Sequence, residues 1–222
     1  MAARDGCAIS EVSQVTNFFL VRHGACDGLG VMLWGRRPHV VLNEEGKAQA
    51  QRTAERFGSV RLDAVYSSPL ERALETAEAI ARVARLEVKQ NAVFNEVDFG
   101  DWTGKSFEEL EHDQRWRRFN SQRGVAKIPN GVPGGELFLD VQARVVAELN
   151  RLTEQHSEQN VAIVSHADVI KAAVGYVAGT PIDLLQRFEI SPASVSIIAT
   201  DQHDTNLHDT KLLAVNSRCE LV

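Results

Sequence analysis

Short apolar runs alternate along this chain with longer stretches in which apolar residues recur at helical spacing. The runs that we expect to form strands are 17–21, 62–66, 86–89, 161–164, 195–199 and 212–215. Helical patterns separate most of these runs. Strands that alternate with helices usually form a parallel sheet that is covered on both faces. We therefore predict an α/β fold, a three-layer α/β/α sandwich whose mostly parallel sheet has helices on both faces.

Capping signals indicate where the helices begin. The expected helices are 44–57, 70–84, 106–119, 136–156, 168–179 and a short one that starts at 180–183. Asn43 is expected to cap the first, because asparagine accepts hydrogen bonds from free amides at a helix start. Ser68, followed by proline, predicts the cap of the second. Ser106 and Glu109 have the spacing of a capping box at the third.

The composition fits one folded domain. The chain has 222 residues, of which 44% are hydrophobic, so it can bury a sizeable core without disulfide or metal cross-links. We expect a flexible N-terminal tail over 1–15 and a single domain over 16–222. Two long segments, 24–42 and 120–135, lack a regular pattern and are predicted to be loops. Loops of this length are often functional.

The charge and the cysteines argue against several classes of protein. A formal net charge of −6 disfavours a nucleic-acid partner, and no apolar run approaches the 18 residues that a membrane span needs. The three cysteines, Cys7, Cys26 and Cys219, do not form a disulfide framework, which favours a reducing, cytoplasmic location. We expect a monomer or homodimer.

Polar residues with chemical potential follow the predicted strands. Arg22 and His23 come at the end of 17–21, and His166 comes at the end of 161–164. Arg72 lies one turn into the helix after 62–66. Because ligands of open α/β sheets bind beyond the carboxyl ends of the strands, we expect these four side chains to converge.

Two arginines and two histidines suit a tetrahedral oxyanion. Arginine offers a fork of donors that matches phosphate oxygens, and neutral histidine is a nucleophile near pH 7. A zinc site made by His23, Glu96, His166 and Asp168 is the rival hypothesis. It is the less favoured one, because two adjacent arginines would repel a cation.

Four sequence blocks occur together in a particular order. They are Val21-Arg22-His23-Gly24, Ser67-Ser68-Pro69-Leu70-Glu71-Arg72, Glu96-Val97-Asp98-Phe99-Gly100 and Val164-Ser165-His166. On these blocks the chain resembles the histidine phosphatase superfamily, in its phosphoglycerate-mutase-like branch. The resemblance extends from about residue 18 to the last strand.

The resemblance implies a role for each matching residue. His23 would be the nucleophile that becomes phosphohistidine, and Arg22, Arg72 and His166 would hold the phosphoryl oxygens. Glu96 would be the general acid and then the general base. No metal or other cofactor is expected. The implied activity is hydrolysis of a small phosphorylated metabolite, with a phosphomutase or a non-catalytic phospho-ligand-binding protein as alternatives.

The sequence also departs from the family pattern. The family usually places an asparagine a few residues after R-H-G, whereas here the run is Ala25-Cys26-Asp27-Gly28-Leu29. The segment 99–104 is closer to the phosphatase-like members than to the mutases.

Several further residues are ambiguous on the sequence alone. The basic residues of 113–127 either attract a second anionic group or form a solvated face; they are Arg115, Arg117, Arg118, Arg123 and Lys127. Trp34 and Trp116 either contact substrate or pack in the core, and packing is favoured. Four further histidines in polar contexts are predicted to lie at the surface; they are His112, His156, His203 and His208.

Overall fold

A computed structural model describes residues 15–129, 135–201, 207, 210–219 and 221. Six strands form one sheet in the order β3-β2-β4-β1-β5-β6. Their bounds are β1 Val15–Arg22, β2 Ala64–Ser67, β3 Val88–Gln90, β4 Asn160–Ser165, β5 Val195–Asp201 and β6 Lys211–Ser217. Apart from Val15, which belongs to β1, the predicted tail lies outside the described residues.

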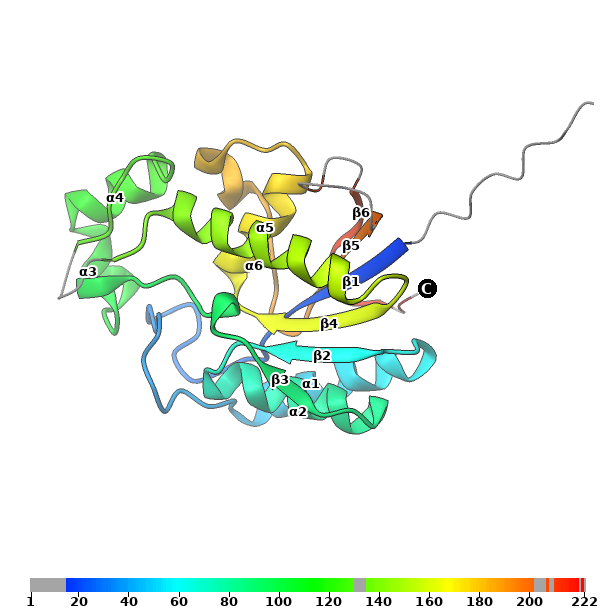
Figure 1. The fold of residues 1–222 in the computed structure, drawn as a ribbon. Coiled ribbons are helices and arrows are strands. Elements are labelled where there is room, and N and C mark those ends of the chain that lie inside the picture. Colours follow the sequence, from blue (N-terminus) through cyan, green and yellow to red (C-terminus); the bar gives the residue numbers. More distant parts are fainter. Residues whose placement is uncertain (1–14, 130–134, 202–206, 208–209, 220, 222) are drawn as a thin grey trace, which may run out of the picture.

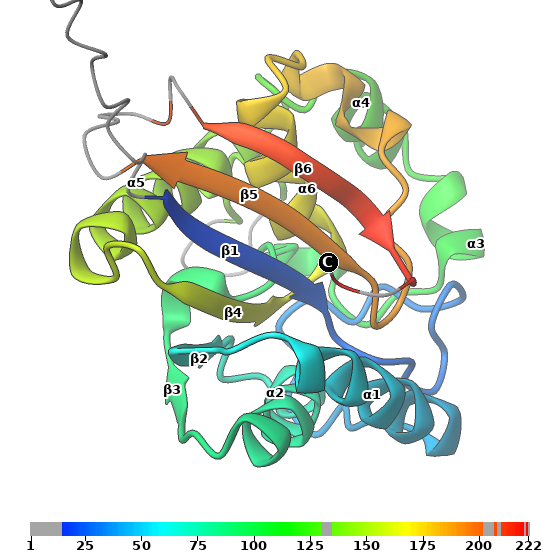
Figure 2. The same ribbon diagram turned by 90° about the vertical axis from the view of Figure 1, so that its right-hand side faces the viewer.

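The sheet is mixed, with a parallel part that carries the strand ends of interest. Strand β4 pairs in parallel with both β1 and β2, and β2 pairs in parallel with β3. Strands β5 and β6 form an antiparallel edge beyond β1, which Figure 2 shows most clearly. The predicted mostly parallel sheet is therefore confirmed.

Helices cover both faces of this sheet. Helices α1 (Glu44–Arg56) and α2 (Glu71–Ala84) lie on one face, and α5 (Phe138–Gln155) and α6 (Ala167–Val177) lie on the other (Figure 1). Two short helices, α3 (Phe107–Glu111) and α4 (Gln114–Ser121), extend past the carboxyl ends of the parallel strands. The described residues also contain four short 3-10 helices; they are η1 Phe57–Ser59, η2 Ala92–Phe94, η3 Gly100–Trp102 and η4 Ile182–Arg187.

Alternate residues of the central strands enter different cores. In β1, Phe18 and Leu20 pack with the core under α5 and α6, whereas Phe19 and Val21 pack with the core over α1 and α2. This division follows from the two-residue period of a strand. A strand that is apolar on both faces needs a helical layer on each side, which explains the sandwich.

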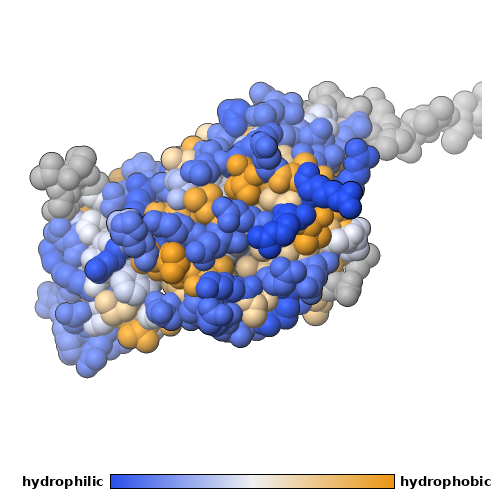
Figure 3. Space-filling model, turned by 90° about the horizontal axis from the view of Figure 1, so that it is seen from below, coloured by the Kyte–Doolittle hydropathy of each residue, from blue (hydrophilic) through white to orange (hydrophobic). Residues whose placement is uncertain are grey.

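The outer surface is mainly polar. Figure 3 views the face that carries α1 and α2 and shows it as largely hydrophilic, with separate apolar patches between the charged side chains. None of the helices in the described ranges combines the length and apolarity needed to cross a membrane.

Two of the predicted helices need correction. Helix α2 begins at Glu71 with Leu70 at the N-cap, so Ser68 does not cap it. The Ser68 oxygen accepts from the amide of Leu70, the residue before the helix, at 3.3 Å, and its hydroxyl also contacts Asn95 and His166 on other segments. The predicted helix 106–119 is two helices, because Asp113 caps α4 and also accepts a hydrogen bond from the Trp102 indole at 3.1 Å.

The two N-caps that local sequence alone determines are confirmed. The Asn43 side chain accepts from the Gly46 amide, and Ser106 and Glu109 form the capping box that their spacing predicts. The end of the first helix differs slightly, because Gly58 lies inside η1 rather than closing α1.

The surface prediction for His156 is wrong. Its side chain is buried, and its ring nitrogens pair with the Tyr66 hydroxyl at 2.9 Å and with Gln159 at 2.6 Å. The spacing of Leu149, Leu152 and His156 continues the buried stripe of α5, and this spacing is the signal that could have revealed it. His112 is exposed as predicted, while His203 and His208 lie outside the described residues.

A close backbone contact fixes the loop after β1 against α1. A Cβ atom on Gly46 would lie 1.9 Å from the Ala25 carbonyl oxygen, and one on Gly24 would lie 2.5 Å from the Gly46 oxygen. Only glycine fits at either position. This contact sets the start of the loop 24–42, which borders the site described below.

We predict that Gly46→Ala destabilises the fold by about 2 kcal/mol, because the backbone must move to admit the methyl group. Urea unfolding measures this change. Gly58→Ala is the matched control, since a Cβ there meets no atom within 4 Å. Equal stability of the two variants would contradict the packing described here.

Candidate active site

Strand register brings the predicted residues to one edge of the sheet. Arg22 lies opposite Ser165 in the β1–β4 pairing, and Ser67 lies opposite Val164 in the β2–β4 pairing. The residues that directly follow β1 and β4, His23 and His166, are therefore neighbours as well. The His23 amide donates to the Ser165 carbonyl at 3.0 Å, so His23 and His166 lie side by side with ring centroids 5.1 Å apart.

The hydrogen bonds of His23 define its tautomer. Its Nδ1 lies 2.7 Å from the Gly24 carbonyl oxygen, which can only accept, so Nδ1 carries the proton. The Nε2 lone pair accepts from the Nε–H of Arg72 at 3.3 Å. Burial, followed by the charges of Arg72 and Arg22, lowers the pKa of His23 well below 6.5. The imidazole is therefore neutral, and Nε2 carries the lone pair rather than the proton.

His166 is neutral for the same reasons and has a defined tautomer too. Arg72 donates from Nη2 to Nδ1 of His166 at 3.3 Å, so this nitrogen is unprotonated. The other nitrogen, Nε2, lies 2.9 Å from the Ser68 hydroxyl, which itself donates to Asn95 at 2.9 Å. Burial and the charge of Arg72 lower the pKa of His166 well below 6.5.

The two arginines are anchored by backbone carbonyls. Arg72 donates from Nη2 to the Gly35 carbonyl at 2.7 Å, and Arg22 donates from Nη1 to the Ile190 carbonyl at 2.6 Å. Within the described structure, Nη1 of Arg72 and Nε of Arg22 are buried without a partner. Buried donors of this kind normally have an acceptor, which an oxyanion would supply.

Glu96 has an unusual acidity. Burial, followed by the negative charge of Asp168, raises the pKa of Glu96 to about 7, although Arg72 and Arg22 act in the opposite direction. Its Oε1 accepts from the Val97 amide at 2.8 Å. The backbone at Glu96 is held by Arg36, which donates to its carbonyl at 2.7 Å. The carboxyl group is therefore partly protonated near neutral pH.

A cavity of about 370 Å³ contains these groups. Arg22, His23, Arg72 and Glu96 line one part of it, and His166 adjoins it through Arg72. The structure therefore brings together all five residues that the sequence singled out.

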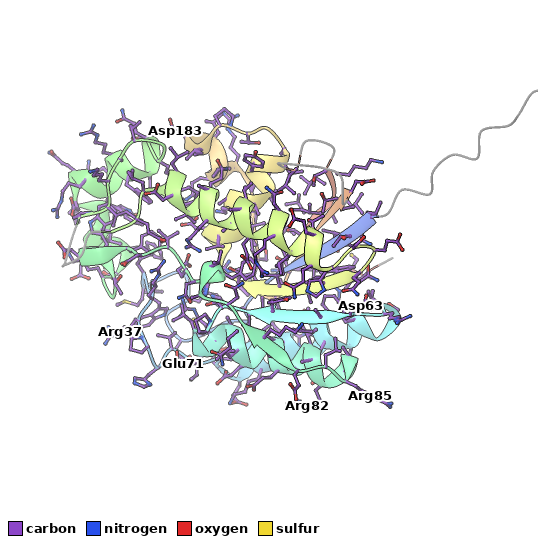
Figure 4. All side chains as sticks on the ribbon, in the orientation of Figure 1. Arg37, Asp63, Glu71, Arg82, Arg85 and Asp183 are labelled. Carbon is purple, nitrogen blue, oxygen red and sulfur yellow. The ribbon has the colours of Figure 1, made fainter. Side chains whose placement is uncertain are left out.

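Two long segments form the other walls of the cavity. The loop 24–42 covers one side; Glu71, labelled in Figure 4, accepts from the His39 amide at 3.0 Å and so ties the loop to α2. Helices α3 and α4 cover the other side. Asp183, also labelled, accepts from the Gly124 amide at 2.9 Å and so ties the segment after α4 to η4.

Sequence reasoning missed two polar side chains of this cavity, and also most of the apolar residues that line its outer part. Asn120 and Gln186 both line it. Trp116, Asn120 and Arg123 are spaced four and three residues apart, and this spacing could have indicated a shared face. No comparable signal marks Gln186.

The ambiguous residues can now be placed. Of the basic residues between 113 and 127, Arg123 alone lines the cavity; it is buried and forms an ion pair with Asp168. Arg115 is exposed and pairs with Asp113.

Trp34 and Trp116 both line the cavity, although Trp116 also packs against Trp102. Cys26 is buried beside the site, and burial raises the pKa of its thiol.

The geometry does not match the rival metal site. In the part of the chain that the structure describes, no three His, Cys, Asp or Glu side chains are grouped so that they could hold an ion. The arrangement is instead a nucleophilic imidazole beside the buried guanidinium group of Arg72 and the half-buried one of Arg22, which suits a tetrahedral oxyanion.

Comparison with known proteins places the chain in a family. The sequence profile of the histidine phosphatase superfamily (branch 1) matches residues 18–212. The chain belongs to this superfamily, and the resemblance inferred from the four sequence blocks is confirmed.

Individual relatives agree with this assignment. The chain is 29% identical to phosphoserine phosphatase 1 of Hydrogenobacter thermophilus over 93% of this chain and 95% of that protein. It is 32% identical to phosphoglycerate mutase-like protein 4 of Arabidopsis thaliana over 73% and 71% of the two chains. Among solved structures, phosphoserine phosphatase from Entamoeba histolytica in complex with 3-phosphoglyceric acid superposes with a TM-score of 0.78 and 27% identity, over 93% of this chain and all of that one.

We predict that both site histidines stay neutral at pH 6, where an ordinary histidine is mostly protonated. The expected ¹⁵N spectrum shows His23 with a proton on Nδ1 and His166 with a proton on Nε2. His23→Asn and His166→Asn assign the signals. A protonated imidazolium at either position at pH 6 would contradict the hydrogen-bond pattern described here.

Proposed function

We propose that this protein hydrolyses a small phosphorylated metabolite through a phosphohistidine at His23. The observation that carries the proposal is the tautomer of His23. The Gly24 carbonyl holds the proton on Nδ1, so the Nε2 lone pair lies beside the Arg72 donors in the cavity. A nucleophile next to a fixed positive charge suits attack on a phosphoryl group.

The phosphoryl oxygens would be held by Arg22, Arg72 and His166. The unpartnered donors on the two arginines, Arg22 Nε and Arg72 Nη1, support this assignment. A bound phosphoryl dianion would also favour protonation of His166 at Nδ1, which would then donate rather than accept. In-line positioning and charge stabilisation are the main requirements of phosphoryl transfer.

Glu96 would supply the proton transfers. As Nε2 of His23 bonds to phosphorus, the bond from phosphorus to the ester oxygen breaks, and protonated Glu96 gives that oxygen its proton. The Glu96 carboxylate then takes a proton from water, whose oxygen attacks phosphorus and releases phosphate from His23. A pKa of about 7 fits a group that must act as acid and then as base.

Two alternatives remain in view. A phosphomutase would use the same phosphohistidine and return the phosphoryl group to a bound alcohol. One relative is named phosphoglycerate mutase-like and another a probable phosphoglycerate mutase. Hydrolysis is favoured because other relatives that match over most of the chain are named phosphatases, including the adenosylcobalamin/alpha-ribazole phosphatase of Escherichia coli, at 28% identity over 90% of this chain and 95% of that protein. A non-catalytic phospho-ligand-binding role is disfavoured because all five site residues are in place.

The sparse cysteines support a cytoplasmic location as part of the proposal.

We predict that the protein hydrolyses p-nitrophenyl phosphate and that EDTA leaves this activity unchanged. His23→Ala should reduce turnover at least 10³-fold, since it removes the nucleophile. Release of p-nitrophenolate is the measurement, and His112→Ala, an exposed histidine, is the matched control. Near-normal turnover in His23→Ala would contradict the phosphohistidine route, and loss of activity in EDTA would revive a metal mechanism.

We predict that Glu96→Gln lowers kcat/KM for ethyl phosphate by about 10²–10⁴-fold and that for p-nitrophenyl phosphate far less. The reason is that ethoxide needs a proton to leave, whereas p-nitrophenolate does not. In the wild type, the kcat/KM for ethyl phosphate divided by that for p-nitrophenyl phosphate should fall as the pH rises through about 7, because Glu96 loses its proton there.

Each kcat/KM is calculated from the concentration of the ester dianion, because p-nitrophenyl phosphate loses its second proton at a lower pH than ethyl phosphate does. Glu108→Gln, which changes an exposed glutamate on α3, is the control. Equal losses on both esters in Glu96→Gln, or a ratio that is constant between pH 5.5 and 8.5, would assign the acid to another group.

A further inference from the structure

The cavity extends well beyond the phosphoryl end, and its outer part is apolar. Five side chains form one wall there, which we call the apolar wall: Met32, Leu33, Trp34, Phe107 and Trp116. A volume of about 370 Å³ lies within the range of roughly 300–1,000 Å³ that is typical for small-molecule sites. The space is larger than a phosphoryl group needs, so the wall faces the leaving group of the ester.

The apolar wall is continuous and held by backbone pairing. The Leu33 amide donates to the Lys105 carbonyl at 2.8 Å, and the Phe107 amide donates to the Val31 carbonyl at 2.8 Å. These bonds join the loop 24–42 to the start of α3. The ring of Trp116 then lies 6.1 Å from that of Phe107, which extends the surface onto α4. Aromatic and branched groups would find a preformed contact surface here.

The outer cavity offers no spare positive charge. Within the described residues, the cationic side chains that line it are Arg22, Arg72 and Arg123. The first two belong to the phosphoryl end. Arg123 is 2% exposed, and its Nη1 pairs with Asp168 at 3.1 Å. Its charge is therefore balanced before any ligand binds.

The other contacts of Arg123 also hold it in place. Its Nη2 donates to Asn120 at 2.9 Å, and its guanidinium carbon lies 4.8 and 4.9 Å from the ring centroids of Phe119 and Phe138. Its Nε is buried without a partner in the described structure. A neutral ligand oxygen or nitrogen could satisfy such a donor, but a second carboxylate or phosphate would also meet the charge of Asp168 across the same cavity.

We propose that the site selects phosphate monoesters whose leaving group carries an aromatic or branched apolar group and no second anionic group. This inference rests on the proposed phosphatase function. It separates this chain from the relatives named phosphoserine phosphatase and from the structural neighbour that holds 3-phosphoglyceric acid. The specificity comes from the apolar wall on one side and from the Arg123–Asp168 pair on the other.

The first test compares esters with leaving groups of similar basicity. The kcat/KM for 2-phenylethyl phosphate should exceed that for ethyl phosphate by at least 10-fold, and it should exceed those for 3-phosphoglycerate and phosphoserine. Trp116→Ala should lower the value for 2-phenylethyl phosphate about 10-fold and change ethyl phosphate less than 2-fold. Val125→Ala is the control, because Val125 is 70% exposed and lies outside the cavity lining.

Met32→Ala repeats the test from the loop, where truncation removes no part of the aromatic cluster. Faster hydrolysis of 3-phosphoglycerate or phosphoserine than of 2-phenylethyl phosphate would overturn the proposal. So would equal behaviour of Trp116→Ala, Met32→Ala and Val125→Ala on all esters.

The second test removes the negative charge that pairs with Arg123. Asp168→Asn should raise the ratio of kcat/KM for 3-phosphoglycerate to that for 2-phenylethyl phosphate at least 10-fold, because the guanidinium then lacks its anion. The ratio is used since Asp168 also affects Glu96, which acts on both substrates. An unchanged ratio would show that the Arg123–Asp168 pair does not exclude anions.

A binding measurement separates specificity from catalysis. 3-Phenylpropylphosphonate and 4-phosphonobutanoate, which have matching chain lengths, imitate the two kinds of ester but cannot be hydrolysed. Calorimetry should give at least 10-fold tighter binding of 3-phenylpropylphosphonate. Absence of p-nitrophenyl phosphate hydrolysis together with this preference would refute the phosphatase function and keep the specificity. Tighter binding of the carboxylated phosphonate would refute the specificity whatever the turnover.

Discussion

The guanidinium group of Arg72 is the contact on which the geometry of the site depends. Burying a charge is costly unless its donors are satisfied, and here three segments accept from Nε and Nη2 of Arg72. Arg72 reaches His23 after β1, His166 after β4 and the carbonyl of Gly35 in the loop 24–42. A side chain from α2 thus fixes the distance between two strand ends and the loop that covers them. Nη1 of Arg72 remains for a ligand oxygen.

The same cavity produces opposite protonation states in its histidines and in its carboxyl group. Desolvation favours the neutral form of every buried group, so it lowers the pKa of both imidazoles and raises that of Glu96. The arginines lower the pKa of the two imidazoles further, and Asp168 raises the pKa of Glu96 further. A nucleophile needs a free lone pair and a general acid needs a proton. Burial therefore prepares both partners of the proposed reaction at neutral pH.

The strand ends could be predicted from the sequence because they depend on local patterns. The position of Arg22, His23 and His166 after apolar runs, together with the rule for open α/β sheets, was sufficient to expect their convergence. Contacts between distant segments could not be read in this way. Ser68 looks like a helix cap, but His166 and Asn95 hold its hydroxyl. The break at Asp113 likewise depends on the Trp102 indole.

The charges of the basic segment illustrate the same limit. Five cationic side chains between residues 113 and 127 suggested an anion site or a solvated face, and sequence reasoning left both open. The structure gives different positions to members of one short segment, since Arg115 is exposed and Arg123 is buried against Asp168. Only the fold shows that Arg123, the one of these five side chains that lines the cavity, is already paired with Asp168.

The most direct test of the central claim is to trap the phosphoenzyme. Rapid quenching during turnover of a phosphate ester, followed by ³¹P NMR and peptide mass spectrometry, identifies the residue and the nitrogen that carry phosphate. The account predicts an acid-labile, base-stable adduct at Nε2 of His23, because the Gly24 carbonyl holds the proton on Nδ1. Turnover without an adduct, or an adduct on another residue or on Nδ1, would contradict it.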